Sequence, residues 1–175
     1  MRFRATALPG LVEVLAEPAA DARGRFLRTW CAEEFAAAGL GFRPHQVSLS
    51  ENRARHTLRG LHWQARPAGE CKLVRCLRGA VFDVAVDLRP DSPAYRRWVG
   101  VELRAEAHNA LLIPAGFAHG FLTLTENAWL EYMIDAPYRP EAARGARWND
   151  PAFGIAWPAA PAVISERDAT WPDHG

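Results

Sequence analysis

The stretch Val81-Phe-Asp-Val-Ala-Val-Asp-Leu88 decides the fold class of this chain, because its side chains alternate in character with a period of two. Such a period is the pattern of a β-strand, in which successive side chains point to opposite faces of a sheet. One face carries Phe82, Val84, Val86 and Leu88, and the other carries Asp83, Ala85 and Asp87. The stretch therefore predicts a strand with one strongly apolar face.

Further strand signals surround this stretch and make β-structure dominant. These strand signals lie at residues 98–103, 110–113 and 128–134, and clusters of Gly, Pro, Asn and Asp separate them. Short strands at near-regular spacing with turn residues between them are typical of a sandwich or barrel. The sequence therefore predicts an all-β fold of the jelly-roll type.

Helix is scarce in the same pattern. Residues 32–38 are rich in alanine and glutamate and are followed by Gly39 and Gly41, which predicts one short helix. The proline-rich tail from Pro151 onward is expected to be irregular and to wrap the surface. The sequence shows no internal repeat or linker, so we expect residues 1–175 to form a single domain.

Composition sets the broad class of protein. The chain has 21 basic and 20 acidic residues, and this near balance gives no reason to expect nucleic-acid or membrane binding. Three cysteines, Cys31, Cys71 and Cys76, make neither a disulfide framework nor a zinc motif. They are expected to be small buried side chains in a reducing compartment. Since the N-terminus has no long apolar run, we expect a cytoplasmic protein.

The first candidate site lies in Leu58-Arg-Gly-Leu-His62-Trp-Gln64, which Lys72-Leu-Val-Arg75 follows. These segments contain a titratable imidazole, a lysine and arginines that suit phosphate. Removal of a proton beside a carbonyl needs such a base and such a positive charge, and phosphate-binding arginines are needed if the substrate is linked to a nucleotide. The spacing predicts a hairpin of strands 58–64 and 71–77 that brings His62 near Lys72. An ideal strand would point Arg59 and His62 to opposite faces, so a bulge at Gly60 is needed to bring them together.

Two further segments add chemistry. Ile113-Pro-Ala-Gly-Phe-Ala-His119 matches the PxGxxH element of cupin barrels, in which the histidine points inward. The upstream HxH of metal-binding cupins is replaced by His62-Trp-Gln64, so a metal held by His62, Glu70 and His119 is a minor alternative. Tyr132 is expected to point inward with Leu130 and Ile134, as an acid that faces the imidazole.

Together these motifs resemble the dTDP-4-dehydrorhamnose 3,5-epimerase family of nucleotide-sugar epimerases. The resemblance runs over nearly the whole chain. The ordered matches are Asp21-Ala-Arg-Gly24, Gln46 with Ser48, LRGLHWQ, KLVRC, GAVFDVAVDLRPDSP, IPAGFAHGF, the Tyr132/Tyr138 pair, Arg147-Trp-Asn-Asp-Pro151, Gly154-Ile-Ala-Trp-Pro158 and Arg167-Asp168. So many matches in order are far more specific than any one of them.

The resemblance implies a cupin-like jelly roll that needs no metal or cofactor, and a homodimer whose N-terminal strands cross to the partner. It implies His62 as the base that removes the proton next to the C4 ketone, with Asp168 as its partner. Lys72 would stabilise the enolate oxygen, and Tyr132 would return a proton from the opposite face. The positions implied to bind substrate are Arg23, Gln46, Ser48, Arg59, His119, Tyr138 and Arg167.

The chain departs from the family pattern where substrate is read. Arg28 and Ala143 stand where the family often has glutamate, and Ser48 stands where asparagine is usual. The resemblance therefore implies inversion of C3, C5 or both on a nucleotide-linked 4-keto-6-deoxy sugar, first of all dTDP-4-dehydro-6-deoxyglucose.

Four alternatives stay open at this point. Within the fold they are a mono-epimerase for CDP- or GDP-linked sugars and a 3,4-ketoisomerase. A ketoisomerase has less need of an inward Tyr132. The others are a metal-dependent cupin dioxygenase, which the missing HxH disfavours, and a non-catalytic sugar-binding barrel.

Overall fold

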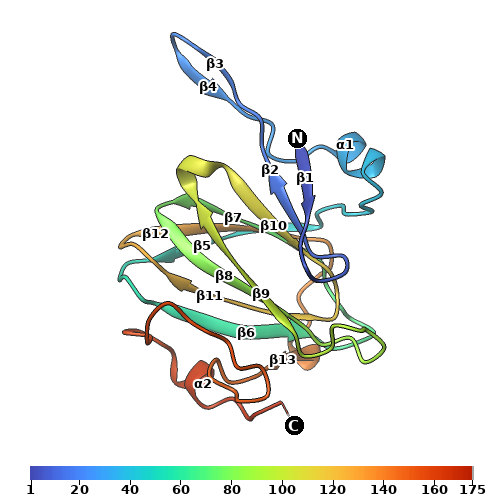
Figure 1. Ribbon diagram of the computed structural model, residues 1–175, viewed down its shortest axis with the longest axis vertical. Helices are drawn as coiled ribbons and strands as arrows, with labels where there is room; N and C mark the ends of the chain where they lie inside the picture. Colours follow the sequence, from blue (N-terminus) through green and yellow to red (C-terminus); the bar gives the residue numbers. More distant parts are fainter. Residues whose placement is uncertain (175) are drawn as a thin grey trace.

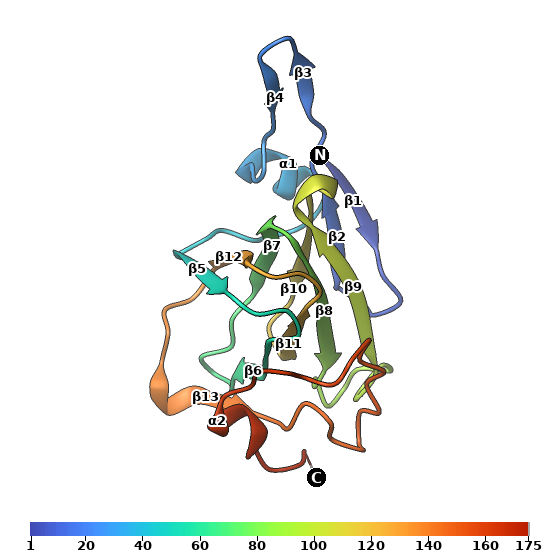
Figure 2. The same cartoon turned by 90° about the vertical axis from the view of Figure 1, so that its left-hand side faces the viewer.

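The computed structural model describes residues 1–174 and consists of two facing antiparallel sheets (Figures 1 and 2). The six-stranded sheet has the order β1 (Arg2–Ala5), β2 (Val12–Leu15), β10 (Asn109–Ile113), β7 (Lys72–Arg78), β12 (Ala128–Ile134), β5 (Gln46–Asn52). The five-stranded sheet has the order β13 (Ala143–Gly145), β6 (Leu58–Gln64), β11 (Phe117–Thr123), β8 (Ala80–Asp87), β9 (Trp98–Arg104). The predicted cupin-like jelly roll is confirmed.

The remaining elements are short. A separate hairpin of β3 (Ala19–Asp21) and β4 (Gly24–Phe26) projects from the body of the molecule (Figures 1 and 2). The α-helices are α1 (Ala32–Ala37) and α2 (Glu166–Ala169), and the 3₁₀ turns are η1 (Ala105–Ala107) and η2 (Pro140–Ala142). None of the helices within residues 1–174 is long and apolar enough to cross a membrane.

Strand β8 has the predicted alternation, and both of its faces are buried. Val84 and Val86 pack outward against the irregular tail, where Phe153 and Trp157 cover the five-stranded sheet. Val81 and Ala85 belong to the main core between the sheets. Asp83 and Asp87 are completely buried. The tail wraps the barrel as predicted and closes the outer side of this sheet.

The outer face of the six-stranded sheet is covered in part by α1 and the chain that follows it. Phe35 of α1 and Phe42 pack on Leu73 and Leu112. The helix ends one residue earlier than predicted, and the Gly39 that follows has φ +73. This packing stabilises the helix, since six residues are too few to be helical alone in water.

The predicted hairpin of β6 with β7 is wrong. β6 pairs with β11 and β13, whereas β7 pairs with β10 and β12, so the two strands lie in different sheets. The segment between them crosses from one sheet to the other. Gln64 anchors the crossing, because its side-chain amide donates to Glu70 and to the carbonyls of Ala68 and Pro137.

The bulge expected at Gly60 is present. His62 is paired with His119, and Arg59 with Phe121, so three steps along β6 match two steps along β11. Gly60 has φ +126, a conformation that L side chains rarely adopt. A Cβ at this position would lie 2.5 Å from the Cα of Gly120. Glycine therefore permits the bulge that brings Arg59 and His62 to the same cavity.

Candidate active site

A cavity of about 330 Å³ lies between the two sheets and gathers most of the predicted residues. It is lined by Gln46, Ser48, Leu49, Ser50, Arg59, His62, Glu70, Lys72, His119, Tyr132, Ile134, Tyr138 and Asp168. All four predicted catalytic residues line it, and so do five of the seven predicted substrate-binding residues. Arg23 and Arg167 do not.

His62 and Asp168 form a hydrogen-bonded pair. The Nε2 of His62 lies 2.6 Å from Oδ1 of Asp168, and the other carboxylate oxygen accepts the backbone N–H of Gly60 at 3.1 Å. Burial alone would raise the pKa of Asp168, but these hydrogen bonds and the His62 charge lower it overall. A carboxylate on Nε2 fixes the imidazole tautomer and leaves Nδ1 as the basic nitrogen.

Asp168 is placed by the short helix α2. The hydroxyl of Ser165 accepts the backbone N–H of Asp168 at 3.1 Å and so caps the helix. The tail thus returns to the barrel and brings a carboxylate to an imidazole 106 residues earlier in the chain. The two predicted partners therefore come from distant parts of the chain and meet in one wall of the cavity.

Lys72 is almost fully buried at the start of β7, with 9% of its side chain exposed. Its ammonium lies 3.0 Å from Oε1 of Glu70 and 3.4 Å from the carbonyl oxygen of His62. An ammonium group has three N–H donors, so one remains for a ligand in the cavity. The arrangement can stabilise negative charge that develops on an oxygen.

The metal set His62, Glu70 and His119 does not form. Glu70 is engaged by Lys72 and accepts the side-chain amide of Gln64 at 2.9 Å. Within residues 1–174 no group of three or more His, Cys, Asp or Glu side chains is placed to hold a metal ion.

Tyr132 points inward from β12, as predicted, with Leu130 in the core and Ile134 in the cavity wall. Its ring lies edge to face against His119, with centroids 5.8 Å apart. Burial raises the pKa of the phenol well above 10.0, and the nearby charge of Asp83 raises it further. The phenol therefore keeps its proton at neutral pH and can act as an acid.

Two residues behind the site escaped sequence reasoning. Asp83 accepts a hydrogen bond from Nε2 of His119 at 2.9 Å, and Asn52 accepts one from Nε of Arg59 at 2.8 Å. Both are buried polar side chains on strands. The only signal in the sequence was an aspartate on the less apolar face of the strand at 81–88, and it did not identify the partner.

The remaining binding residues lie at the edge of the six-stranded sheet. Gln46 and Ser48 on β5 are paired with Ile134 and Tyr132 on β12. Tyr138 follows β12 and is 57% exposed, so its ring lies at the rim of the cavity. Ring and amide groups at a rim suit a flat, polar part of a ligand.

Arg167 lines a neighbouring hollow of about 130 Å³ that shares His62, Glu70 and Tyr138 with the cavity. Its guanidinium lies 4.8 Å from the ring centroid of Trp171. Ala143 lines the same hollow. Arg28 lies elsewhere and pairs with Glu34 at 3.1 Å.

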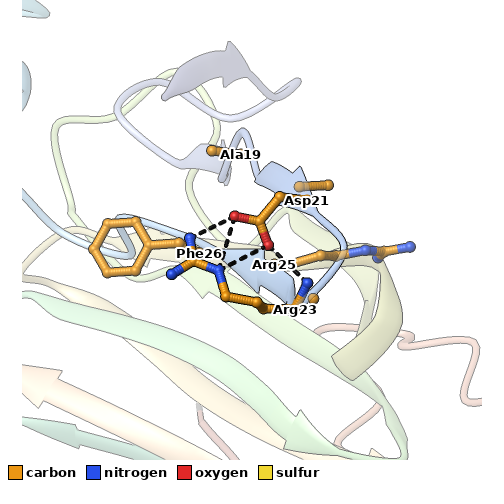
Figure 3. Close-up of a pocket in the computed structure, with 7 residues that line it drawn as sticks. Ala19, Asp21, Arg23, Arg25 and Phe26 are labelled. Atoms are coloured by element: carbon orange, nitrogen blue, oxygen red, sulfur yellow. Dashed lines mark hydrogen bonds and ion pairs between the residues drawn. The ribbon is translucent and has the colours of Figure 1, made fainter.

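Arg23 is the one predicted residue that lies far from the cavity within a single chain. It sits at the turn of the β3–β4 hairpin, where its side chain is paired with Asp21 (Figure 3). Phe26 on the same hairpin is 78% exposed. The hairpin projects beyond the body of the molecule, so Arg23 is not part of its own chain's site.

Comparisons with known proteins agree with this geometry. The family model for dTDP-4-dehydrorhamnose 3,5-epimerase matches residues 5–174. The Sinorhizobium fredii protein of that name is 46% identical over 155 residues, which are 87% of this chain and 78% of the relative.

Solved structures agree as well. The 4-keto-6-deoxy sugar epimerase from the novobiocin gene cluster of Streptomyces spheroides superposes with a TM-score of 0.93 at 37% identity, over 99% of this chain and 87% of that one. The Legionella pneumophila 3,5-epimerase in complex with dTDP-4-keto-L-rhamnose gives 0.93 at 35% identity, over 98% and 92%. By sequence and by structure, this chain belongs to the dTDP-4-dehydrorhamnose 3,5-epimerase family, a family of isomerases.

Proposed function

We propose that this protein inverts C3 and C5 of dTDP-4-dehydro-6-deoxyglucose to give dTDP-4-dehydrorhamnose. The observation that carries the proposal is one cavity with a base on one sheet and an acid on the facing sheet. His62 belongs to the five-stranded sheet, whereas Tyr132 and Lys72 belong to the six-stranded sheet. Inversion of a carbon needs proton removal on one side and proton return on the other.

In the proposed reaction His62 removes the proton from the carbon next to the C4 ketone. Its bond to Asp168 at 2.6 Å supports this role, because the carboxylate stabilises the imidazolium that forms. A positioned base typically contributes about 10²–10⁴-fold to the rate.

Lys72 stabilises the enolate that results. The ketone itself accepts the electron pair from the broken C–H bond, and the negative charge collects on the C4 oxygen. A preorganised donor at that oxygen is worth about 3–4 kcal/mol. The buried ammonium of Lys72, 3.0 Å from Glu70, is such a donor.

Tyr132 then gives a proton to the carbon from the opposite face. The raised pKa of its phenol supports this role, because the group is protonated when the enolate forms. The same steps at the second carbon complete a double inversion. After each step, Tyr132 regains a proton and His62 loses one.

The nucleotide and sugar are held by the arginines and polar groups at the rim. Arg59, fixed by Asn52, suits a phosphate, and Gln46, Ser48, His119 and Tyr138 suit the sugar and base. Arg167 borders the nucleotide end through the adjoining hollow.

A mono-epimerase is the second candidate, on the same or another nucleotide carrier. Ala143 favours it, because it lines the hollow beside the cavity at a position where the family pattern has a carboxylate that reads substrate. Both candidates need the same base, lysine and phenol, so they differ only in which carbons lose their protons.

We propose further that two copies of this single-domain chain form a dimer in which the β3–β4 hairpin of each reaches the site of the other. The projecting hairpin with its exposed Phe26 supports this, and so do Val47 and Leu49 on the edge strand β5, which are 60% and 51% exposed. Exposed edge strands are common sites of pairing with another chain. The exchange would deliver Arg23 to the partner's nucleotide.

A complementation experiment tests the dimer. Arg23→Ala and His62→Ala proteins are each expected to have little activity. Mixed after brief unfolding and refolding, they form heterodimers in which one site has both an intact His62 and an intact Arg23 from the other chain. Recovered activity supports the exchange, and no recovery in a mixture shown to contain heterodimers contradicts it.

We also propose that the protein works in the cytoplasm. Its three cysteines, Cys31, Cys71 and Cys76, are free thiols, and burial raises the pKa of Cys71 to about 12. Unpaired thiols suit a reducing compartment.

The deciding experiment is proton NMR of the enzyme with dTDP-4-keto-6-deoxyglucose in deuterium oxide. Exchange of the protons at both C3 and C5, followed by rhamnose formation with a downstream reductase, supports the double epimerase. Exchange at one carbon identifies a mono-epimerase. Exchange at neither carbon, with correctly folded protein, rejects dTDP-4-keto-6-deoxyglucose as the substrate.

A further inference from the structure

A second imidazole–carboxylate pair borders the cavity, and the proposed function gives no role to its carboxylate, Asp83. The Nε2 of His119 lies 3.0 Å and 2.9 Å from the two carboxylate oxygens of Asp83. Asp83 is completely buried, and His119 is 4% exposed. Since a buried carboxylate needs a donor, Asp83 has a structural reason to hold the N–H of this ring.

The second pair has the same arrangement as the first. In both, the carboxylate contacts Nε2 of the imidazole. His119 and His62 are direct cross-strand partners of β11 and β6, so the two rings belong to neighbouring positions of one sheet. Both line the cavity, whereas Asp83 lies behind it.

This geometry sets what His119 can offer to a ligand. An ionised carboxylate only accepts hydrogen bonds, so Nε2 carries a proton that points at Asp83. In the neutral ring the other nitrogen, Nδ1, then has a free lone pair. Nδ1 makes no hydrogen bond with any of residues 1–174. A lone pair that borders a sugar site is an acceptor for a hydroxyl, not a donor for a phosphate.

We infer that Asp83 is a positioning residue: it fixes the tautomer of His119 so that Nδ1 accepts a hydrogen bond from a hydroxyl of the sugar. This inference rests on the proposed function and assigns to the His119 site the recognition of a hydroxyl at C2 or C3. The ring of His119 also packs against Tyr132. The hydrogen bond from the sugar hydroxyl to Nδ1 would therefore hold the sugar between His62 and Tyr132.

The first test uses Asp83→Asn, which keeps the shape of the side chain. An amide can either accept from or donate to Nε2, so it no longer selects one tautomer. We expect kcat/KM to fall about tenfold. In the His119→Gln background Asp83→Asn should cause no further fall in kcat/KM, because Asp83 acts through His119. An equal loss in both backgrounds would overturn the inference.

Asp87→Asn is the matched control. Asp87 lies on the same strand and is equally buried, but it binds Arg89 and Ser92 instead of a residue of the cavity. It should lower the melting temperature and leave kcat/KM of the folded enzyme unchanged. An equal loss of kcat/KM in the Asp83→Asn and Asp87→Asn enzymes would mean that Asp83 has only a structural role.

Substrate analogues identify the hydroxyl. The fall in kcat/KM caused by Asp83→Asn should disappear with one of two analogues, the 2-deoxy or the 3-deoxy sugar. That analogue is the one that lacks the hydroxyl that His119 contacts. A penalty that is the same for the parent sugar and both analogues contradicts recognition of a hydroxyl.

A spectroscopic measurement keeps the inference testable if Asp83→Asn does not fold. In ¹⁵N-histidine-labelled wild-type protein, the resonance that His119→Gln removes should show an unprotonated Nδ1. A protonated Nδ1 overturns the inference. Because this measurement needs no substrate, it also separates failure of the inference from failure of the proposed reaction, which the C3 and C5 exchange experiment reports.

Discussion

Replacement of Lys72 by methionine removes a buried positive charge and keeps a side chain of similar length. Two of the three ammonium donors are engaged, by Glu70 at 3.0 Å and by the His62 carbonyl at 3.4 Å. The proposed function assigns the third to the C4 oxygen of the substrate. Loss of one preorganised donor to a developing oxyanion costs about 2.7–4 kcal/mol, or about 10²–10³ in kcat. The ketone of bound substrate is neutral, so KM should change much less.

The assay follows solvent exchange of the C3 and C5 protons at saturating substrate, with KM measured in a coupled reductase reaction. Melting temperature must be recorded as well, because Lys72→Met leaves the Glu70 carboxylate with only the Gln64 amide at 2.9 Å. Removal of one partner of a buried ion pair costs about 3–5 kcal/mol of stability. Enzyme that remains folded at the assay temperature is therefore the only valid comparison.

Glu70→Gln separates the catalytic role of the lysine from the ion pair. It removes the counter-charge and keeps the ammonium, so exchange should stay within a few-fold of wild type. The double variant Lys72→Met/Glu70→Gln should recover stability but not activity. The reasoning is refuted if Lys72→Met enzyme exchanges both protons at the wild-type rate, or if Glu70→Gln loses as much kcat as Lys72→Met.

Three other outcomes are expected. His62→Ala should abolish exchange at C3 and C5 and leave dTDP binding intact; exchange at the wild-type rate would reject His62 as the base. Tyr132→Phe should allow exchange but little inversion, and it should also reduce the loss of stability at alkaline pH. The reason for the second effect is that the unfolded chain releases the phenol proton above its ordinary pKa of 10.0, whereas the raised pKa in the folded protein retains it. Equal alkaline unfolding curves for the two proteins would contradict the burial of this phenol. EDTA should leave activity unchanged, and a loss restored by added metal would favour a metal-dependent reaction.

The sequence predicted the strands better than their pairing. Alternation within residues 81–88 depends only on local geometry, and it identified β8 almost to the residue. The pairing of β6 with β7 was wrong, because two strands joined by a short segment form a hairpin only if both belong to one sheet. β7 has buried residues on both faces and lies between β10 and β12, a long-range choice that the pattern of one segment does not contain.

The candidate site shows the same limit. Sequence motifs identified His62, Lys72 and Tyr132 as candidate residues. They did not identify the buried groups that hold the site's side chains in place. Asp83 and Asn52 contact residues that are 36 and 7 positions away, and each could equally have been a solvated side chain. Arg23 matched a motif, yet it lies between β3 and β4 and does not line its own chain's cavity. Partners of buried polar groups are set by tertiary structure, so spacing alone does not identify them.

The arrangement of the two sheets explains why this fold suits inversion. A base and an acid on neighbouring positions of one strand would meet the same face of a sugar and return the proton to the side it left. Here the His62–Asp168 pair belongs to the wall formed by β6 and the tail, and Tyr132 stands on β12 in the facing sheet. The bulge at Gly60 turns Arg59 into the same space, so in the proposed reaction one strand, β6, would supply both the base and a group that holds the substrate. In the proposed reaction a sugar ring between these walls would have His62 on one face and Tyr132 on the other, and the stereochemical outcome would follow from the separation of the sheets.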